Sequence, residues 1–235
     1  MTRGYVFTAA CGCLALAIAA SAPSAFAGIG TASTGDAQAT LSFPDVVLDG
    51  SGLCFETEIS VDVVAPAEVF WGVEVEFRKP GTVPLSSTGR FSGEGSRSEV
   101  DQIQICPSDG IGEMLVEGEF TTYGNAETSV PLTTTFVLSK TPATVRVNRA
   151  KYRKGMTRVT GKVTTESAQY GTVTTYGDVV AQYRLPKTKK WRKMGSSYAN
   201  NDGFTIESTK RFPRGTKFRV VFKGNDFAQT ARSGG

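Results

Sequence analysis

The sequence predicts an all-β protein in which two antiparallel β-sandwiches follow one another along the chain. Apolar and polar residues alternate with a period of two through residues 37–138 and again from residue 144, and no stretch shows helical periodicity. Runs rich in Gly, Pro, Asn and Asp separate the alternating segments at short intervals. The sign of the charge also reverses once, near the middle of the chain, which indicates two separate units.

Residues 1–27 have the layout of a secretory signal peptide. Arg3 precedes an apolar run, and Ala25 and Ala27 supply the small residues of a cleavage site, so we expect the mature chain to begin at Gly28. An uncleaved anchor is the alternative, but the apolar run is short for a membrane span of about 20 residues. No later stretch is long and apolar enough to be an integral membrane segment. We therefore expect a secreted protein, either free or associated with the cell wall.

The charge changes sign at residues 139–143. Residues 28–140 contain 5 Lys and Arg against 17 Asp and Glu, a net charge of −12, whereas residues 141–235 contain 20 against 5, a net charge of +15. Pro142 lies at this change and disfavours helix in the residue before it. We therefore expect an acidic sandwich over residues 28–140, a basic sandwich over residues 141–235, and a short linker between them.

Two cysteines, Cys54 and Cys106, remain once the signal is removed. Both belong to the acidic half and stand at the ends of predicted strands. In an oxidising compartment such an even pair predicts a disulfide. A catalytic thiol is the alternative, but the chain contains no His that would activate it.

Carboxylate pairs mark the predicted solvent faces of the acidic half. They are Glu56 and Glu58, Glu74 and Glu76, and Glu117 and Glu119. Alternate residues of a strand point the same way about 6.5–7 Å apart, a separation that suits the two carboxylates of a glycosidase. Trp71, however, is predicted on the core-facing side of the strand that carries Glu74, so it does not supply a sugar-stacking aromatic. Calcium is a second possibility, but no compact Asp-x-Asp-x-Asp loop occurs. We favour a solvated acidic face with basic residues nearby, because like charges on neighbouring strands repel.

Short motifs in the basic half carry a family resemblance. They are Arg153-Lys154-Gly155, Val159-Thr160-Gly161-Lys162-Val163, Val179-Val180-Ala181-Gln182-Tyr183-Arg184, Trp191, Asp202-Gly203-Phe204 and Phe218-Arg219-Val220-Val221-Phe222-Lys223-Gly224. Over about residues 142–233 this succession resembles the bacterial immunoglobulin-like domains of secreted actinobacterial proteins. The resemblance implies an immunoglobulin-like sandwich with Trp191 in its core and a non-catalytic spacer or adhesion role. It carries no set of functional residues, and the acidic half resembles no family that we can name.

One segment of the basic half combines many cations with an indole. Lys187, Lys189, Lys190, Arg192 and Lys193 surround Trp191 in a predicted hairpin tip. Such a tip would attract polyanions, and an exposed Trp191 would stack on a base or a sugar. The alternative is that the lysines prevent edge-to-edge pairing of strands while Trp191 packs inward, and for the indole we favour this alternative. Further cations that extend the positive surface are Arg146, Arg149, Lys151, Arg153, Lys154, Lys210, Arg211, Arg214, Lys217, Arg219 and Lys223.

The absence of His removes the Ser-His-Asp triad, His-ligated zinc and imidazole acid–base chemistry. No glycine-rich phosphate loop is present either, so we expect no cofactor, no metal and no enzymatic activity. The sequence instead predicts a surface-interaction protein whose basic half contacts an anionic cell-wall or extracellular polymer. Nucleic acid matches the charge but not the compartment. Two alternatives stay open: weak self-association through the opposed halves, and a carboxylate-dependent glycoside hydrolase or carbohydrate-binding module.

Overall fold

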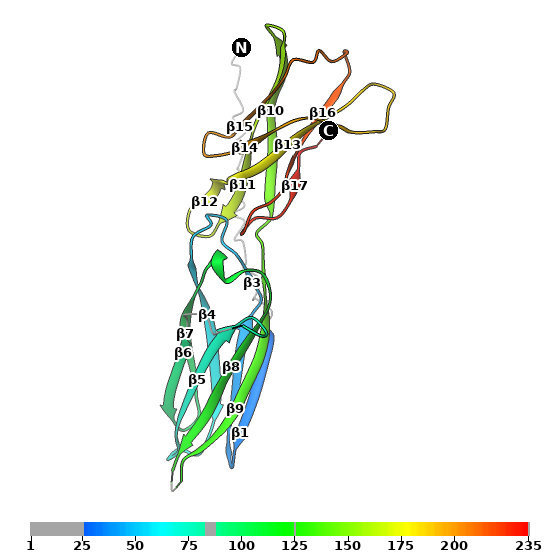
Figure 1. Cartoon of the computed structure of the whole chain (residues 1–235). Helices are drawn as coiled ribbons and strands as arrows, with labels where there is room; N and C mark the ends of the chain where they lie inside the picture. Colours follow the sequence, from blue (N-terminus) through cyan, green and yellow to red (C-terminus); the bar gives the residue numbers. More distant parts are fainter. Residues whose placement is uncertain (1–25, 83–87, 125, 235) are drawn as a thin grey trace, which may run out of the picture.

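The structure, a computed structural model, describes residues 26–82, 88–124 and 126–234 (Figure 1). Seventeen strands and one short 3₁₀ turn are present, and no α-helix occurs in this described part of the chain. The prediction of an all-β protein is therefore confirmed. The expected signal peptide lies outside the described residues, except that its last two residues begin the first strand.

The named strands fall into two groups that do not share a sheet. Every pairing joins strands within residues 26–139 or strands within residues 143–232. The two groups lie end to end (Figure 1). We refer to residues 26–140 as the acidic half and to residues 141–234 as the basic half.

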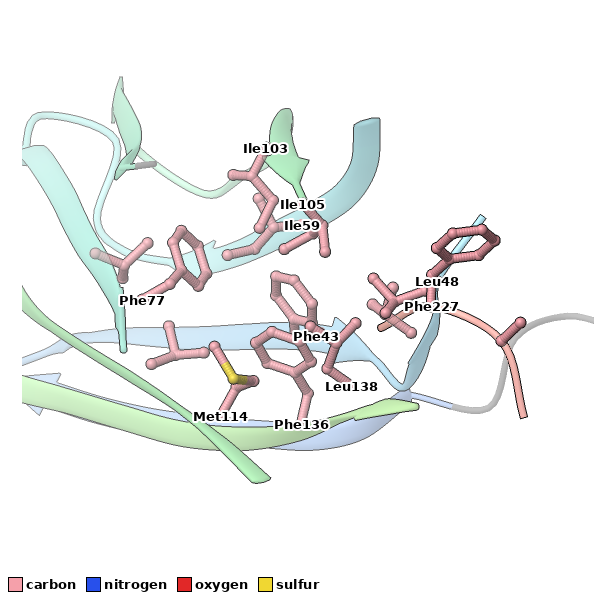
Figure 2. Close-up of a cluster of buried hydrophobic side chains, with 14 of the residues drawn as sticks. Phe43, Leu48, Ile59, Phe77, Ile103, Ile105, Met114, Phe136, Leu138 and Phe227 are labelled. Atoms are coloured by element: carbon pink, nitrogen blue, oxygen red, sulfur yellow. The ribbon is translucent and has the colours of Figure 1, made fainter. Parts of the chain in front are cut away.

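The acidic half contains two packed sheets. Their strand orders are β1-β2-β4-β7 and β3-β9-β8-β5-β6, and all neighbours are antiparallel except β3 and β9. The strands are β1 (Phe26–Thr34), β2 (Ala37–Pro44), β3 (Val46–Val47), β4 (Phe55–Val64), β5 (Phe70–Arg78), β6 (Thr88–Glu94), β7 (Arg97–Ile105), β8 (Gly112–Tyr123) and β9 (Thr128–Ser139). The core lies between the sheets, where the rings of Phe43 and Phe136 stack 4.1 Å apart (Figure 2).

The alternation read from the sequence places the correct residues in this core. Val61 on β4 and Val75 on β5 are fully buried, whereas Glu58 and Glu74 on the same strands are exposed. Trp71 is buried as expected, and its indole Nε1 donates a hydrogen bond of 2.8 Å to the carbonyl oxygen of Gly95. The indole thus satisfies its single polar group inside the core.

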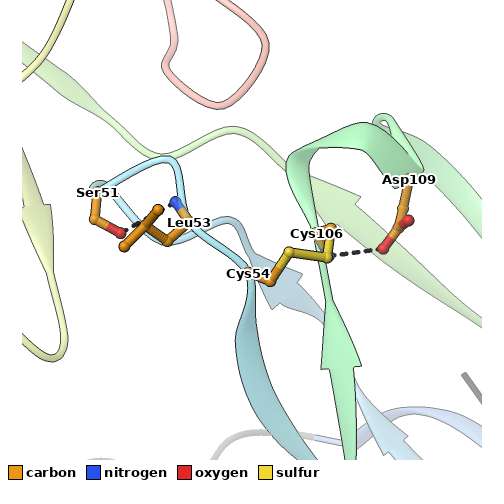
Figure 3. The surroundings of a disulfide bond; sticks show 5 residues. All are labelled: Ser51, Leu53, Cys54, Cys106 and Asp109. Carbon is orange, nitrogen blue, oxygen red and sulfur yellow. Dashed lines mark hydrogen bonds between the residues drawn. A yellow bond between two sulfur atoms is a disulfide. The ribbon is translucent and has the colours of Figure 1, made fainter.

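Cys54 and Cys106 form a disulfide, so this prediction is confirmed (Figure 3). The bond joins the residue before β4 to the residue after β7. The backbone N–H of Cys106 donates a hydrogen bond of 2.7 Å to a carboxylate oxygen of Asp109, in the 3₁₀ turn Pro107–Asp109. The disulfide therefore fixes one end of residues 48–53, a loop that reaches the basic half.

The basic half also contains two sheets. One has the order β10-β11-β12 with β15 paired to β11, and the other has the order β14-β13-β16-β17. The strands are β10 (Ala143–Arg153), β11 (Met156–Ser167), β12 (Gly171–Thr174), β13 (Gly177–Arg184), β14 (Arg192–Ala199), β15 (Phe204–Ser208), β16 (Lys217–Phe222) and β17 (Ala231–Arg232). Val159 and Val163 of one sheet and Val179 and Val220 of the other are fully buried.

The connection between the halves is packed instead of free. Strand β9 ends at Ser139 and β10 begins at Ala143. Thr141, between them, is buried; its N–H donates to the carbonyl of Phe227 at 2.8 Å, and its carbonyl accepts from the N–H of Gln229 at 2.9 Å. These bonds hold the end of the linker against the loop that follows β16 in the basic half.

The loop of residues 48–53 makes a second connection. The Gly50 N–H donates to the carbonyl of Glu166 at 3.1 Å, and the Thr165 hydroxyl donates to the carbonyl of Gly50 at 2.6 Å. A Cβ at Gly50 would lie 2.1 Å from that Glu166 oxygen, so only glycine fits here. Leu48 and Phe227 are buried beside this contact, and they unite the cores of the two halves in one hydrophobic cluster (Figure 2).

Strand β1 was not expected from the sequence. Its segment is rich in small residues and begins before the apolar alternation becomes regular. The reason for the small residues is close packing on β9: a Cβ at Gly28 would lie 2.1 Å from the carbonyl oxygen of Thr135, and one at Gly30 would lie 2.3 Å from that of Thr133. Glycine here allows two backbones to approach, which is invisible to an alternation pattern.

Candidate polyanion-binding surface

The part of the basic half that lies away from the acidic half carries three connections, of which two lie at its tip and the loop between β13 and β14 projects to the side (Figure 1). They are the turn between β10 and β11, the loop of residues 185–191 between β13 and β14, and the loop of residues 209–216 between β15 and β16. We call this part the distal end. Antiparallel pairing brings these connections together although they are far apart in the sequence.

The outer surface of the β10–β11 hairpin, which we call the hairpin face, is densely cationic. Thr157 and Val159 of β11 are buried, so the residues that alternate with them point outward. The outward cross-strand pairs are Arg149 with Thr160, Lys151 with Arg158, and Arg153 with Met156, and Lys154 occupies the turn. These side chains line a hollow of about 470 Å³.

One acidic residue accompanies the hairpin face. Glu207, on the neighbouring strand β15, accepts from Arg158 at 2.5 and 2.6 Å. No ion pair of Arg149, Lys151 or Arg153 with an acid occurs among the described residues. Most of the positive charge on this face therefore meets only water or an external anion.

The cations predicted at residues 187–193 lie on the distal end, as a loop that leads into β14. Lys187, Lys189 and Lys190 are exposed in this loop, and the exposed Arg192 and Lys193 begin the strand. The structure does not bring them onto the hairpin face, because the hairpin and β14 belong to different sheets. The basic surface thus has two parts, one on each sheet.

The expectation that Trp191 packs into the core is wrong. Its indole is only partly buried, with Cζ of Arg219 at 4.2 Å and Cζ of Arg184 at 5.0 Å from the ring centroid. Gln182 and Arg184 alternate with the buried Ala181 and Tyr183, so they lie on the outer face of this sheet. Two guanidinium groups on that face hold the indole outside the core.

The third connection joins the two parts of the distal end. Lys210 donates a hydrogen bond of 2.9 Å to the hydroxyl of Tyr183, and Arg211 lies over the ring of Tyr152 on β10. The bond from Lys210 lowers the pKa of the Tyr183 hydroxyl, and the charge of nearby Arg192 acts in the same direction. Both effects reflect concentrated positive charge at this end of the molecule.

Backbone geometry singles out two lysines. Among the described residues, Lys154 and Lys187 are the two non-glycine residues with positive φ, at 50° and 62°. Side chains with a Cβ rarely adopt this conformation, and it costs roughly 1–2 kcal/mol per residue. Glycine would serve both turns better, yet each carries a cation at the distal end.

The acidic half carries a different array. Cross-strand register places Glu74 opposite Glu119 and Glu76 opposite Glu117 on the outer faces of β5 and β8. Arg90 pairs with Glu74 at 2.7 Å, which confirms that basic residues lie near the acidic face. The other partners are Arg78 for Glu117 and Ser129, at 3.0 Å, for Glu119.

A hollow of about 340 Å³ lies over this array, lined by Glu74, Glu119, Arg90 and Tyr123 among others. Its two carboxylates already have partners in the sheet, an arrangement that stabilises a charged surface. Among the residues that the structure describes, no group of three or more His, Cys, Asp or Glu side chains is placed to hold a metal ion. No helix in the described ranges has the length and apolar character needed to cross a membrane.

Sequence reasoning missed three arginines of the basic surface, namely Arg158, Arg184 and Arg232. Alternation gives the outward direction of Arg158 and Arg184, because each stands beside a buried apolar position. Arg232 lies on the two-residue strand β17, which has too few residues to show a period.

Comparisons with known proteins add little. No family model matches the chain, and no curated protein matches it. Among solved structures, the transglutaminase of red sea bream aligns with 86% of this chain and 31% of its own length, with a TM-score of 0.41 and 10% identity. A likeness at this level supports no conclusion about the activity of this chain.

Proposed function

We propose that this chain is an exported, non-enzymatic interaction protein made of two immunoglobulin-like β-sandwiches, whose basic half binds an anionic polymer of the cell wall or extracellular space. The observation that carries the proposal is the shortage of acidic partners at the distal end. The basic half contains 20 Lys and Arg and 5 Asp and Glu, and its ion pairs among described residues are Arg158 with Glu207 and Lys223 with Asp178.

The strained turns support the same proposal. A cation at a position that favours glycine is retained at a cost in stability, and such local strain is typical of functional sites. Lys154 and Lys187 carry this cost on the two separate parts of the distal end. A polymer long enough to contact both parts would meet positive charge along its length.

The experiment uses the full chain from Gly28 onward and measures its sedimentation with isolated cell walls and with a defined anionic polysaccharide. One variant combines Arg149→Ser, Lys151→Ser and Arg153→Ser, and a matched variant combines Lys187→Ser, Lys189→Ser and Lys190→Ser. We expect retention at low ionic strength that falls steeply with added salt, because bound cations release counterions. We also expect both variants to weaken it.

A sharper variant combines Lys154→Gly and Lys187→Gly. It relieves the positive-φ strain at both turns, so the protein should unfold at an equal or higher temperature while its retention by the polymer falls. Retention that is unaffected by salt, or equal in wild type and all three variants, would overturn the proposal.

Self-association is a second candidate, and the packed junction favours it. The loop of residues 48–53 bonds to the basic half through Gly50 and holds the halves end to end, so the acidic face around Glu74 cannot fold back onto the distal end of the same molecule. The distal end of a second copy has the complementary charge, which suits head-to-tail contact. Sedimentation velocity at low and high salt tests this, and a monomer in both buffers would exclude it.

A further inference from the structure

The outer face of the sheet β14-β13-β16-β17 holds two arginines over one indole and a third arginine beside them. We call Arg184, Arg219, Arg232 and Trp191 the arginine–tryptophan cluster. Strand β13 contributes Arg184, β16 contributes Arg219 and β17 contributes Arg232, with Arg232 opposite Val221, two residues from Arg219. Arg184 and Arg219 thus lie over the Trp191 ring, and the charge of Arg232 acts on Arg219 from the neighbouring strand.

The described residues give the cluster no acidic counter-charge. Among the described residues, none of its arginines forms an ion pair with a carboxylate. Asp178 lies at the other end of β13, where its carboxylate is 3.9 Å from Nζ of Lys223. Partial burial lowers the pKa of the Arg219 guanidinium, and the charges of Arg232 and Arg184 lower it further. Positive charges that raise one another's energy in this way are stabilised by an anion.

The contact with Trp191 leaves donors of the guanidinium groups available for such an anion. The Cζ atoms of Arg184 and Arg219 lie over the indole ring, which accepts no hydrogen bond from their terminal N–H groups, and such groups make bidentate hydrogen bonds. Nε of Arg219 donates to the side-chain oxygen of Gln182 at 2.7 Å, which fixes the direction of the group. The terminal nitrogens of Arg219 and the edge of Arg184 have no hydrogen bond to a protein oxygen among the described residues.

We propose that the arginine–tryptophan cluster binds one tetrahedral oxyanion, a phosphate or sulfate ester group, carried by the polymer. The inference rests on the proposed function, because it names the chemical group that the basic half recognises. Three guanidinium groups offer more donors than the two oxygens of a carboxylate accept, whereas a phosphate or sulfate ester has several terminal oxygens directed to different sides. The site therefore selects esters over uronic acids.

The experiment measures tryptophan emission of the full chain from Gly28 while an anion is added at constant ionic strength. The probes are inorganic phosphate, inorganic sulfate and acetate, with chloride as the balancing ion. The chain contains two tryptophans, and Trp71 is buried in the acidic half, so a change in emission reports on Trp191. We expect a saturable change with phosphate or sulfate and none with acetate, and the ratio of the first two separates the two esters.

Two variants keep the positive charge of the cluster but remove the planar guanidinium group. Arg219→Lys and Arg184→Lys retain a cation but lose the planar fork, and each should weaken phosphate binding about 10-fold, the loss of one charge-assisted bidentate contact. Arg146→Lys is the matched control, an exposed arginine on β10 of the other sheet. The unfolding temperature of each variant is measured together with its phosphate affinity, so that a loss of folding is recognised. The comparison of phosphate with acetate uses the wild type alone and does not depend on any variant.

Each outcome decides something. No saturable change, equal responses to acetate and phosphate, or an unchanged affinity in both lysine variants would show that the stacking only stabilises the sheet, and would overturn the inference. Polymer retention that persists in Arg219→Lys but disappears in the hairpin-face variant would leave the proposed function in place without this site. Selective phosphate binding without polymer retention would support this site and overturn the proposed function.

Discussion

The two halves have the same construction but differ in how many of their cations form ion pairs within the same half. Each consists of two packed sheets, but the acidic half contains 5 Lys and Arg against 17 Asp and Glu, and the basic half contains 20 against 5. Three of the five cations of the acidic half, Arg78, Arg90 and Arg97, pair with glutamates of the same half. In the basic half two of the twenty cations have such partners among the described residues. The acidic half thus partly neutralises itself, whereas most cations of the basic half have no acidic partner among the described residues.

The halves also differ in covalent support. The acidic half has the disulfide, and the basic half has no cysteine. The disulfide borders residues 48–53, which carry the contacts to the basic half. The disulfide therefore lies next to the junction. A displacement of the loop of residues 48–53 would change the orientation of the two charged surfaces.

The largest expected effect comes from removing the disulfide with Cys54→Ala and Cys106→Ala. Their sequence separation is 52, and closing a loop of that size stabilises the folded state by about 4 kcal/mol in the chain-entropy model. Guanidinium unfolding followed by Trp71 emission in a Trp191→Phe background should show this loss. Emission of Trp191 in a Trp71→Phe background should show the same loss, because the cores of the two halves form one cluster and unfold together. A loss reported by Trp71 alone would contradict this coupling.

Phe227→Ala is expected to have the next largest effect. The ring is 1% exposed and joins the two cores beside Leu48, so its loss should cost about 3 kcal/mol. Unfolding of the acidic and basic halves should then separate into two transitions. Phe222→Ala is the matched control, because this ring is equally buried but lies within the basic half. It should lower stability without separating the transitions.

The sequence predicts the fold class, the disulfide and most buried positions of the strands, because period-two alternation reports directly on which face a side chain occupies. It fails where long-range packing decides. No pattern in the sequence marks Gly50 or Phe227, although they form the junction. Trp191 reads as a core residue by resemblance, but Arg184 and Arg219 hold it on the outer face. The cationic character of the distal end is visible in composition, and its division over two sheets is not.

Asp49 gives the junction a dependence on pH. Burial alone raises the pKa of its carboxyl, but hydrogen bonds from Ser51, Ala168 and Ser167 outweigh burial and lower the pKa below its usual value of 3.8. A carboxyl whose pKa is lowered by folding stabilises the folded state at pH values above its usual pKa. This contribution disappears as the pH falls through the lowered pKa. Asp49→Asn should therefore lower the free energy of unfolding by about 1 kcal/mol at neutral pH. In acid the variant and the wild type should be equally stable. Stability measured from pH 7 to pH 2 tests this, and an equal loss at every pH would contradict it.

The smallest effects on stability are expected from two variants that each break one exposed ion pair. These variants should nevertheless differ clearly in their retention by the polymer. Arg90→Ala in the acidic half and Glu207→Gln in the basic half each remove one partner of an exposed ion pair, and such pairs contribute only about 0–1 kcal/mol. Arg90→Ala leaves Glu74 opposite Glu119, so added salt should stabilise this variant more than the wild type. Glu207→Gln instead frees Arg158 on the hairpin face, so polymer retention should increase at low salt. If Arg90→Ala lowers retention by as much as Glu207→Gln raises it, net charge alone governs binding, and the distinction between a self-neutralised acidic half and an available basic half fails.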